Sequence, residues 1–274
     1  MKRWLATFAL TLLCVLPLAA DVTIVTTTTL EGPMMAMAGT QGANLAPKIV
    51  TRIKGTKSRT EVEMGDQLMV TLMDLTTKEA ILLRPAQKTA QVLTNTPAPG
   101  EKPKLTLPKI DSRLKATGKS REVSGQQCDE YTVEMRMDMA SMTPNMPPEA
   151  AAMLKDVRMV MGGMLYVAKG APGVAEYQKF QASAAKVALG ALSGLGGGTQ
   201  MPAGLEQLMA GFAEAPGIPY LTELTLTVEG SGPMVDMMKK MGEMKMISRV
   251  TSVTTDALAD TLFKVPEDYK MVKQ

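Results

Sequence analysis

Short segments in which apolar and polar residues alternate dominate the first half of the chain. Residues 21–30 (DVTIVTTTTL) are rich in β-branched side chains, which favour an extended strand. Residues 48–94 continue with segments spaced by about ten residues, a spacing typical of an antiparallel sheet with hairpin connections. Turn residues such as Gly55, Gly65 and Pro85 separate them. The segments are KIVTRIKGT, KSRTEVEM, QLMVTLMDL, EAILLRP and TAQVLT.

The clearest alternation covers residues 131–139. The odd positions are apolar and the even positions are polar, which predicts a strand with one dry and one wet face. Residues 149–156 then predict a short helix that opens after Pro148, and residues 157–168 return to a strand pattern. The apolar positions of the first strand are Tyr131, Val133, Met135, Met137 and Met139.

The hydrophobic period changes after residue 168. Pro172 suits the first turn of a helix, and Tyr177 and Phe180 begin an apolar face at helical spacing. A Gly-rich link follows, and residues 205–212 carry a second helical stripe. We therefore expect a helical insert over about residues 172–214. Strand patterns return at its end, with a short helix marked by Met234, Met237, Met238 and Met241 between two strands.

These patterns predict an α+β protein with a single domain over residues 21–274. We expect one curved antiparallel sheet that forms a half-barrel. Helices over roughly residues 172–192 and 203–213 would pack on its concave face.

The amino terminus has the pattern of a secretory signal peptide. Two basic residues precede an apolar run over residues 4–18, and an Ala-Ala pair ends it. The run is too short for a comfortable membrane span. We therefore expect residues 1–20 to be cleaved and the protein to be periplasmic, with secretion as the alternative. No second apolar run of membrane length follows, so we expect no membrane span after cleavage.

Charge and residue types argue against several classes of function. Lys and Arg total 30 against 27 acidic residues, and loss of the leader's two basic residues brings the mature chain closer to neutrality. A nucleic-acid surface needs concentrated basic charge, so we expect no nucleic-acid partner. The absence of histidine removes the commonest general base, the usual zinc ligand and the Ser-His and Cys-His nucleophile arrangements. We therefore expect neither enzymatic activity nor a cofactor.

Cys128 is the one cysteine outside the leader, so the mature chain has no partner for an intramolecular disulfide. A small buried residue is the favoured interpretation, because free cysteine behaves as a hydrophobe. A redox or mixed-disulfide thiol is the alternative. Its even position places Cys128 opposite Tyr131 and Met135 in a regular strand, unless a bulge intervenes.

Three segments resemble a known family. They are REVSGQQCDEY at residues 121–131, the stretch at residues 164–180 with its Ala171-Pro172-Gly173, and LFKVPEDYK at residues 262–270. Together they resemble the bacterial exported proteins of domain-of-unknown-function family 4412. The resemblance implies a fold similar to the periplasmic lipoprotein carriers, whose curved sheet wraps around helices and offers a concave apolar surface. It carries no catalytic residues over to this chain.

The leading hypothesis is a non-enzymatic periplasmic binding or carrier-like protein. It would hold an apolar or lipidic ligand, or a lipoprotein segment, in a groove between sheet and helix. A purely structural envelope protein is an alternative, and the sequence specifies neither the ligand nor the oligomeric state. The groove candidates are Tyr131, Met135, Met137, Tyr166, Tyr177 and Phe180.

The chain contains 25 methionines, and their thioethers suggest a second hypothesis. Thioethers are soft ligands that favour Cu(I). One methionine group lies on a predicted connection between strands, beside Lys239 and Lys240. The competing interpretation is apolar filler, because methionine commonly fills irregular cores and adaptable surfaces. The candidate metal ligands are Met237, Met238, Met241 and Met244.

Overall fold

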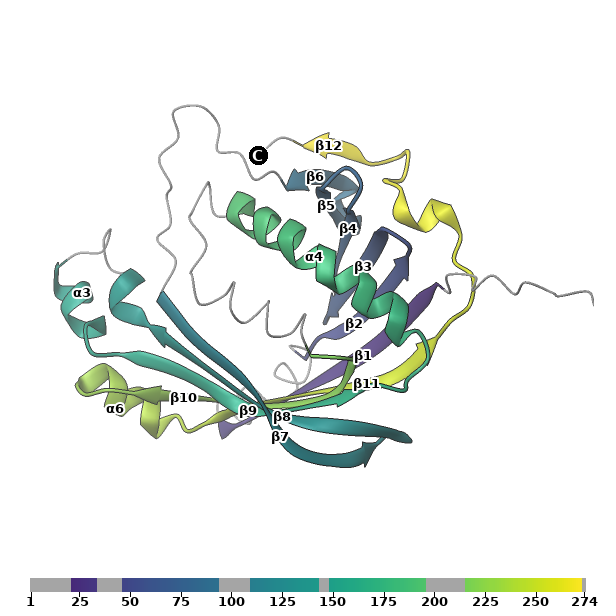
Figure 1. Ribbon diagram of the computed structural model, residues 1–274. Helices are drawn as coiled ribbons and strands as arrows, with labels where there is room; N and C mark the ends of the chain where they lie inside the picture. Colours follow the sequence, from purple (N-terminus) through teal and green to yellow (C-terminus); the bar gives the residue numbers. More distant parts are fainter. Residues whose placement is uncertain (1–20, 34–45, 94–108, 143–147, 196–214, 273–274) are drawn as a thin grey trace, which may run out of the picture.

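The computed structural model describes residues 21–33, 46–93, 109–142, 148–195 and 215–272, most of which form one sheet of 12 strands (Figure 1). The strand order is β12-β6-β5-β4-β3-β2-β1-β11-β10-β9-β8-β7. Neighbours are antiparallel except β12 and β6, which are parallel. The sheet is open, with β12 and β7 at its two edges. The strands are β1 (Val22–Glu31), β2 (Lys48–Lys54), β3 (Lys57–Met64), β4 (Gln67–Asp74), β5 (Glu79–Arg84), β6 (Thr89–Leu93), β7 (Lys109–Val123), β8 (Gln126–Asp138), β9 (Arg158–Ala168), β10 (Ile218–Glu229), β11 (Met244–Thr254) and β12 (Lys270–Val272).

One long helix, α4 (Val174–Leu195), lies on the inner side of the curved sheet (Figure 1). It contacts β2, β5, β6 and β10. Phe180 and Ala184 are buried in a cluster that also contains Val22, Ile53 and Tyr220 of the sheet. This apolar contact fixes the helix against the strands, because burying such side chains is the main stabilising contribution to folding. The shorter helices are α3 (Pro148–Leu154), α6 (Pro233–Lys240), η1 (Pro85–Gln87), η2 (Met139–Met142) and η3 (Asp260–Phe263).

The predicted strands and the two short helices are confirmed, with boundaries shifted by a few residues. The α+β prediction is correct only in part, because the sheet dominates the described residues and α4 is their one long helix. The second predicted helix, at residues 203–213, lies outside the described residues. The prediction overstated the helices, because it assumed that only helices cover the sheet. The carboxyl-terminal segment also packs on the sheet.

The carboxyl-terminal segment, residues 255–272, covers the face of β3 to β6 opposite α4. Val265 and Tyr269 pack against a buried cluster on that face, and the backbone N–H of Lys270 donates to the carbonyl of Lys88 at 2.9 Å. These contacts give a packing role to the valine and tyrosine of the LFKVPEDYK sequence. The buried residues of the cluster are Val70, Leu72, Leu83 and Ala90.

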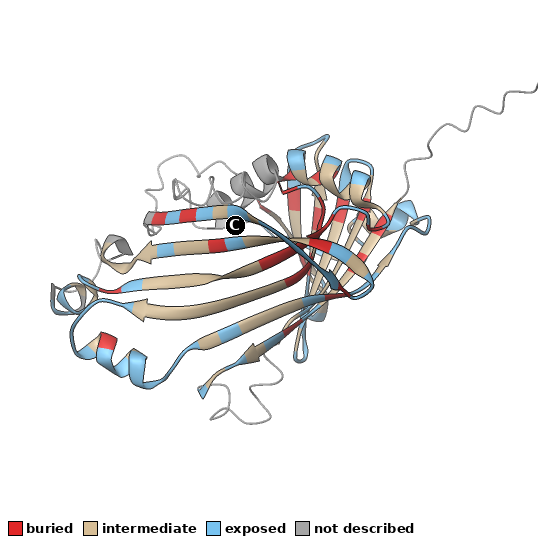
Figure 2. Ribbon diagram, turned by 60° about the horizontal axis from the view of Figure 1, so that its bottom comes forward, coloured by how far each residue is buried: buried red, intermediate tan, exposed pale blue. Residues whose placement is uncertain are grey.

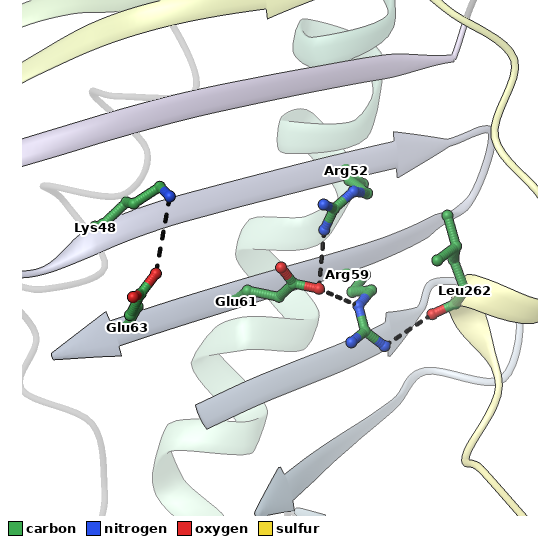
Figure 3. A network of polar contacts seen from close by, with 6 residues as sticks. All are labelled: Lys48, Arg52, Arg59, Glu61, Glu63 and Leu262. Atoms are coloured by element: carbon green, nitrogen blue, oxygen red, sulfur yellow. Dashed lines mark hydrogen bonds and ion pairs between the residues drawn. The ribbon is translucent and has the colours of Figure 1, made fainter. Parts of the chain in front are cut away.

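A polar network on the same outer face connects β2, β3 and this segment (Figure 3). Nε of Arg59 lies 2.6 Å from Oε1 of Glu61, and Nη1 of Arg52 lies 2.9 Å from the same oxygen. Nη1 of Arg59 also donates to the carbonyl of Leu262 at 3.2 Å. Burial alone would raise the pKa of Glu61, but hydrogen bonds from the two arginines and their charges hold it below its usual value.

Burial changes along the long strands β9 and β10. Residues 165–168 of β9 and residues 220–221 of β10 are buried, whereas residues 159–164 and 222–228 are half-buried. Figure 2 shows the same change, with red near α4 and tan over the rest of the long strands. The sheet therefore has a closed core near α4 and a more open half beyond it.

Candidate functional site

The inner face of the open half is defined by strand register. Tyr131 pairs with Leu165, Leu165 with Thr222, and Thr222 with Ser248. Cross-strand partners point to the same face of a sheet. Thr222 and Ser248 line a cavity together with Tyr177 and Gln181 of α4. The side chains in register with them therefore lie on the α4 side of the sheet.

Methionines from three strands lie together on this inner face. Met137 pairs with Met159, and Met135 pairs with Met161. Met161 pairs in turn with Leu226, and Leu226 with Met244. We call this surface the methionine face. Its members are Met135, Met137, Met159, Met161, Leu224, Leu226, Val228, Met244 and Met246, and all of them are half-buried.

The opposite face of β8 and β10 is mainly polar. Thr132, Glu134 and Arg136 of β8 and Thr225 and Thr227 of β10 occupy the alternate positions. Arg136 forms an ion pair with Glu134, with 2.8 Å between Nε and Oε1. On β9 and β11 the outer face also carries apolar residues such as Met164 and Ile247. The inner face is therefore the more continuously apolar of the two, and its side chains are not fully covered. Large exposed or partly exposed apolar surfaces commonly mark sites of binding.

Helix α6 encloses part of the methionine face in a cavity of about 320 Å³. Met238 and Met241 contribute from α6 and the residue after it, and Met244 follows on β11. Lys239 and Glu243 are the charged residues of the lining. Ligand sites commonly have volumes of about 300–1,000 Å³ and mainly apolar walls, so this cavity suits a small or narrow apolar group. The remaining lining residues are Met159, Leu226, Thr227, Val228 and Gly242.

The orientation of α6 follows from one buried anchor. Val235 is completely buried, and the backbone N–H of Asp236 donates to the carbonyl of Gly232 at 3.0 Å in the first turn. Successive helical side chains point about 100° apart. Met238, three residues after the anchor, therefore lines the cavity, whereas Met237 is 53% exposed.

A second cavity of about 180 Å³ lies between α4 and the sheet. We call it the hydroxyl cavity, because it collects Thr26, Thr51, Thr222, Ser248 and Tyr177. Desolvation on burial raises the pKa of Tyr177, so its hydroxyl stays protonated near neutral pH. The other lining residues are Ile24, Gln181, Ile218, Pro219 and Val250.

The six predicted groove residues do not share one groove. Tyr131 and Met135 belong to an inner-face cluster with Val133 and Leu165, and Met137 lies beside Met159. Tyr177 and Phe180 of α4 belong to a second cluster, which also includes Tyr166. Tyr166 pairs with Glu130 and therefore points to the opposite face from Tyr131.

Tyr166 is occupied by a contact of its own on that outer face. The guanidinium carbon of Arg121 lies 3.8 Å from the centroid of the Tyr166 ring, a cation–π arrangement. Arg121 also forms an ion pair with Glu223, with 3.5 Å between Nη2 and Oε2. Tyr166 therefore does not line the methionine face. The sequence alone did not separate Tyr166 from the other groove candidates, because residues 164–168 are apolar at both odd and even positions.

Cys128 is buried and free, which confirms the interpretation as a small buried residue. The register of β8 with β9 runs without a break from Cys128 to Tyr131, so no bulge turns the cysteine toward the inner face. It packs in the cluster that contains Val22, Ala168 and Ile218. Residues on both faces of the sheet are buried at the Cys128 end of β8 and β9. This burial raises the pKa of the Cys128 thiol.

Three of the four candidate metal ligands, Met238, Met241 and Met244, line the methionine cavity, and Met237 does not. Sequence reasoning missed Met159, Leu226 and Val228. Their alternation was visible, but the register that places Met159 beside Val228 is a tertiary property. Among the described residues, His, Cys, Asp and Glu form no group of three that would suit a metal ion.

The comparisons with known proteins assign no family. No family model matches the chain, and no curated protein matches it. A crystal structure of an uncharacterized conserved protein from Thermus thermophilus is 9% identical, and the match covers 94% of this chain and 92% of that one with a TM-score of 0.37. The resemblance to family 4412 therefore stays a prediction. Within the described ranges no helix is both long and apolar enough to cross a membrane.

Proposed function

We propose that this protein is a non-enzymatic, periplasmic binding or carrier-like protein for an apolar or lipidic ligand. The ligand's alkyl chain, or a lipid-bearing segment of a lipoprotein, lies on the methionine face and enters the cavity under α6. A single observation supports the proposal: methionines from β9, α6 and β11 line one cavity of about 320 Å³ on a half-buried apolar face.

The chemistry of methionine suits this role. Its unbranched side chain has three rotatable bonds and a polarizable sulfur, so a methionine surface adapts to ligands of different shape. Each methylene group that leaves water contributes about 0.8 kcal/mol to binding. The half-barrel curvature around α4 resembles the arrangement expected for a lipoprotein carrier (Figure 1).

A neighbouring pair of methionines allows a matched test. Met238→Glu places a carboxylate in the cavity, whereas Met237→Glu places one on the exposed side of the same helix. Binding of a fluorescent fatty-acid probe to the full chain is expected to weaken at least tenfold in the first variant and to change little in the second, because a hydrated carboxylate in a mainly apolar cavity takes the place of the alkyl chain, even with Lys239 in the lining. Equal affinities for the two variants would contradict the proposal.

Native mass spectrometry of freshly purified protein supplies an independent measurement. We expect a bound species with the mass of a lipid, and it is expected to be lost from Met238→Glu. Protein that carries no extractable lipid and binds neither a fatty-acid nor a fatty-alcohol probe at micromolar concentration would leave a purely structural envelope role as the better explanation.

Cu(I) binding is the second candidate, because Met159, Met238, Met241 and Met244 line the same cavity. Soft thioethers are suitable Cu(I) ligands. Changing Met238, Met241 and Met244 together to Leu removes three sulfurs and keeps the site apolar. Cu(I) affinity would then fall while the affinity for the fatty-acid probe stays within about threefold, and Met237→Leu serves as the control. Unchanged Cu(I) affinity would exclude this candidate.

A further inference from the structure

The hydroxyl cavity differs in chemistry from the methionine cavity. Thr26, Thr51, Thr222, Ser248 and Tyr177 line it, with Gln181, which is hydrogen-bonded to Tyr177, and none of the described lining residues is charged. Each hydroxyl offers one donor and two acceptor positions, and the amide offers both kinds as well. The cavity therefore suits a small, uncharged group that both donates and accepts hydrogen bonds.

The two cavities lie on one continuous face of the sheet. Thr222, Leu224 and Leu226 are alternate residues of β10, and Ser248, Met246 and Met244 are their partners on β11. Alternate residues of a strand point the same way. Thr222 and Leu226 are four residues apart, so a ligand reaching from one cavity to the other spans roughly 13 Å at about 3.3 Å per residue.

We infer that the hydroxyl cavity holds the uncharged polar head group of an amphipathic ligand whose alkyl chain extends along the methionine face. The inference rests on the proposed function and specifies the ligand class: fatty alcohols and acylglycerols rather than fatty-acid anions or phospholipids. The alkyl chain runs from Thr222 past Leu224 toward the cavity under α6.

The charge of the head group distinguishes fatty alcohols and acylglycerols from fatty-acid anions and phospholipids. A carboxylate or phosphate in the hydroxyl cavity would lose its hydration without gaining a cationic partner, because no Lys or Arg is among the described residues of the lining. Tyr177 is a neutral donor there, because the ordinary pKa of a phenol, about 10, already lies well above neutral pH, and burial raises it further. Ser248 already bonds the hydroxyl of Thr28 at 2.9 Å, which fixes its position and leaves two of its three hydrogen-bonding positions for a ligand.

The test compares head groups on one chain length. The full chain is titrated with dodecanol, monododecanoylglycerol, dodecanoate and dodecyl phosphate, each competing with a fluorescent fatty-alcohol probe. We expect the two uncharged ligands to bind at least tenfold more tightly than the two anions. Among the alcohols, affinity rises by up to about fourfold per added methylene group until the chain fills the methionine cavity.

Two variants examine the hydroxyl cavity directly. Thr222→Val and Thr26→Val remove a hydroxyl with little change in volume. Each lost hydrogen bond is expected to weaken alcohol binding by about threefold to tenfold. Thr225→Val is the matched control, because Thr225 lies on the same strand and lines neither cavity.

The outcomes separate the inference from the proposed function. If alkyl ligands bind and depend on Met238, but anions bind as tightly as alcohols or the threonine variants bind alcohols normally, the inference is wrong and the proposed function stands. If no alkyl ligand of any head group binds, the proposed function itself fails. Thermal unfolding midpoints of all variants within a few degrees of the wild type establish that the losses are not due to unfolding.

Discussion

The guanidinium group of Arg59 donates a hydrogen bond to the carbonyl oxygen of Leu262 over 3.2 Å (Figure 3). Arg59 belongs to β3, in the first half of the chain, and Leu262 precedes the last strand. The contact ties the carboxyl-terminal segment to the outer face of the sheet. Leu262 belongs to η3, and Val265 and Tyr269, which follow η3, pack against the apolar cluster of β4 to β6.

Arg59→Ala is expected to destabilise the protein and to loosen this segment. The change removes hydrogen bonds to Leu262 and Glu61 that involve a charged donor. Such bonds contribute about 1.5–3 kcal/mol each, but both are only partly buried and Glu61 keeps its ion pair with Arg52, so only part of that sum is lost. We expect the free energy of unfolding to fall by about 1–3 kcal/mol in urea denaturation, with faster amide exchange at Lys270. Arg113→Ala is the control, because Arg113 is exposed and its ion pair with Asp111 is long.

Stability is expected to fall in acid partly through Glu61. Its pKa in the folded protein lies below the usual value of 4.5, because hydrogen bonds and charge from Arg59 and Arg52 outweigh the effect of burial. A group with a lowered folded pKa contributes stability above its unfolded pKa and loses that contribution as pH falls through the folded pKa. Urea denaturation between pH 3 and pH 6 should therefore show a smaller loss of stability below about pH 4.5 in Glu61→Gln than in the wild type. Parallel curves for the two proteins would contradict the assignment.

Two adjacent glycines of β9 are expected to respond differently to alanine. A Cβ at Gly163 would lie 1.9 Å from the carbonyl oxygen of Glu223, whereas a Cβ at Gly162 would approach nothing closer than 3.8 Å. Gly163→Ala must push β9 and β10 apart, and we expect a loss of about 1–3 kcal/mol in the free energy of unfolding. Gly162→Ala should change it by less than about 0.5 kcal/mol. Similar values for both variants would show that β9 and β10 do not approach so closely.

Cys128 is expected to be unreactive in the native protein. The thiolate is the reactive form, and burial both raises the pKa of the thiol and blocks access. Iodoacetamide labelling followed by peptide mass spectrometry should show almost no modification of Cys128 without denaturant and complete modification in urea. Rapid native labelling would revive the interpretation as a redox thiol.

Peroxide oxidation offers a map of the methionine cavity. Met237 and Met271 are more than half exposed and should oxidise fastest, whereas Met159 and Met244 are half-buried. Addition of dodecanol is expected to slow the oxidation of Met238 and Met241 and to leave the rate at Met271 unchanged. Delipidation should have the reverse effect on the same two residues. Uniform protection of all these methionines would indicate a general effect rather than binding in this cavity.

The sequence by itself determined the strands, their order along the chain and the position of the long helix. Alternation at a period of two shows which positions of β8 share a face, and Pro172 with the spacing of Tyr177 and Phe180 indicates the helix start. These are local properties, so neighbouring residues are sufficient to show them. The alternation around Met135 and Met137 also identified one strand of the methionine face.

Only the tertiary structure decided which strands and helices meet. The pairings of β1 with β11 and of β6 with β12 join strands from the first hundred residues to strands near the carboxyl terminus, and no local pattern specifies such partners. The same register separates Tyr166 from Tyr131, although both are aromatic residues of long strands. It also brings Met159 and Met244 close to Met238. Each strand contributes one row of side chains to a face, and the walls of a cavity need rows from several neighbouring strands.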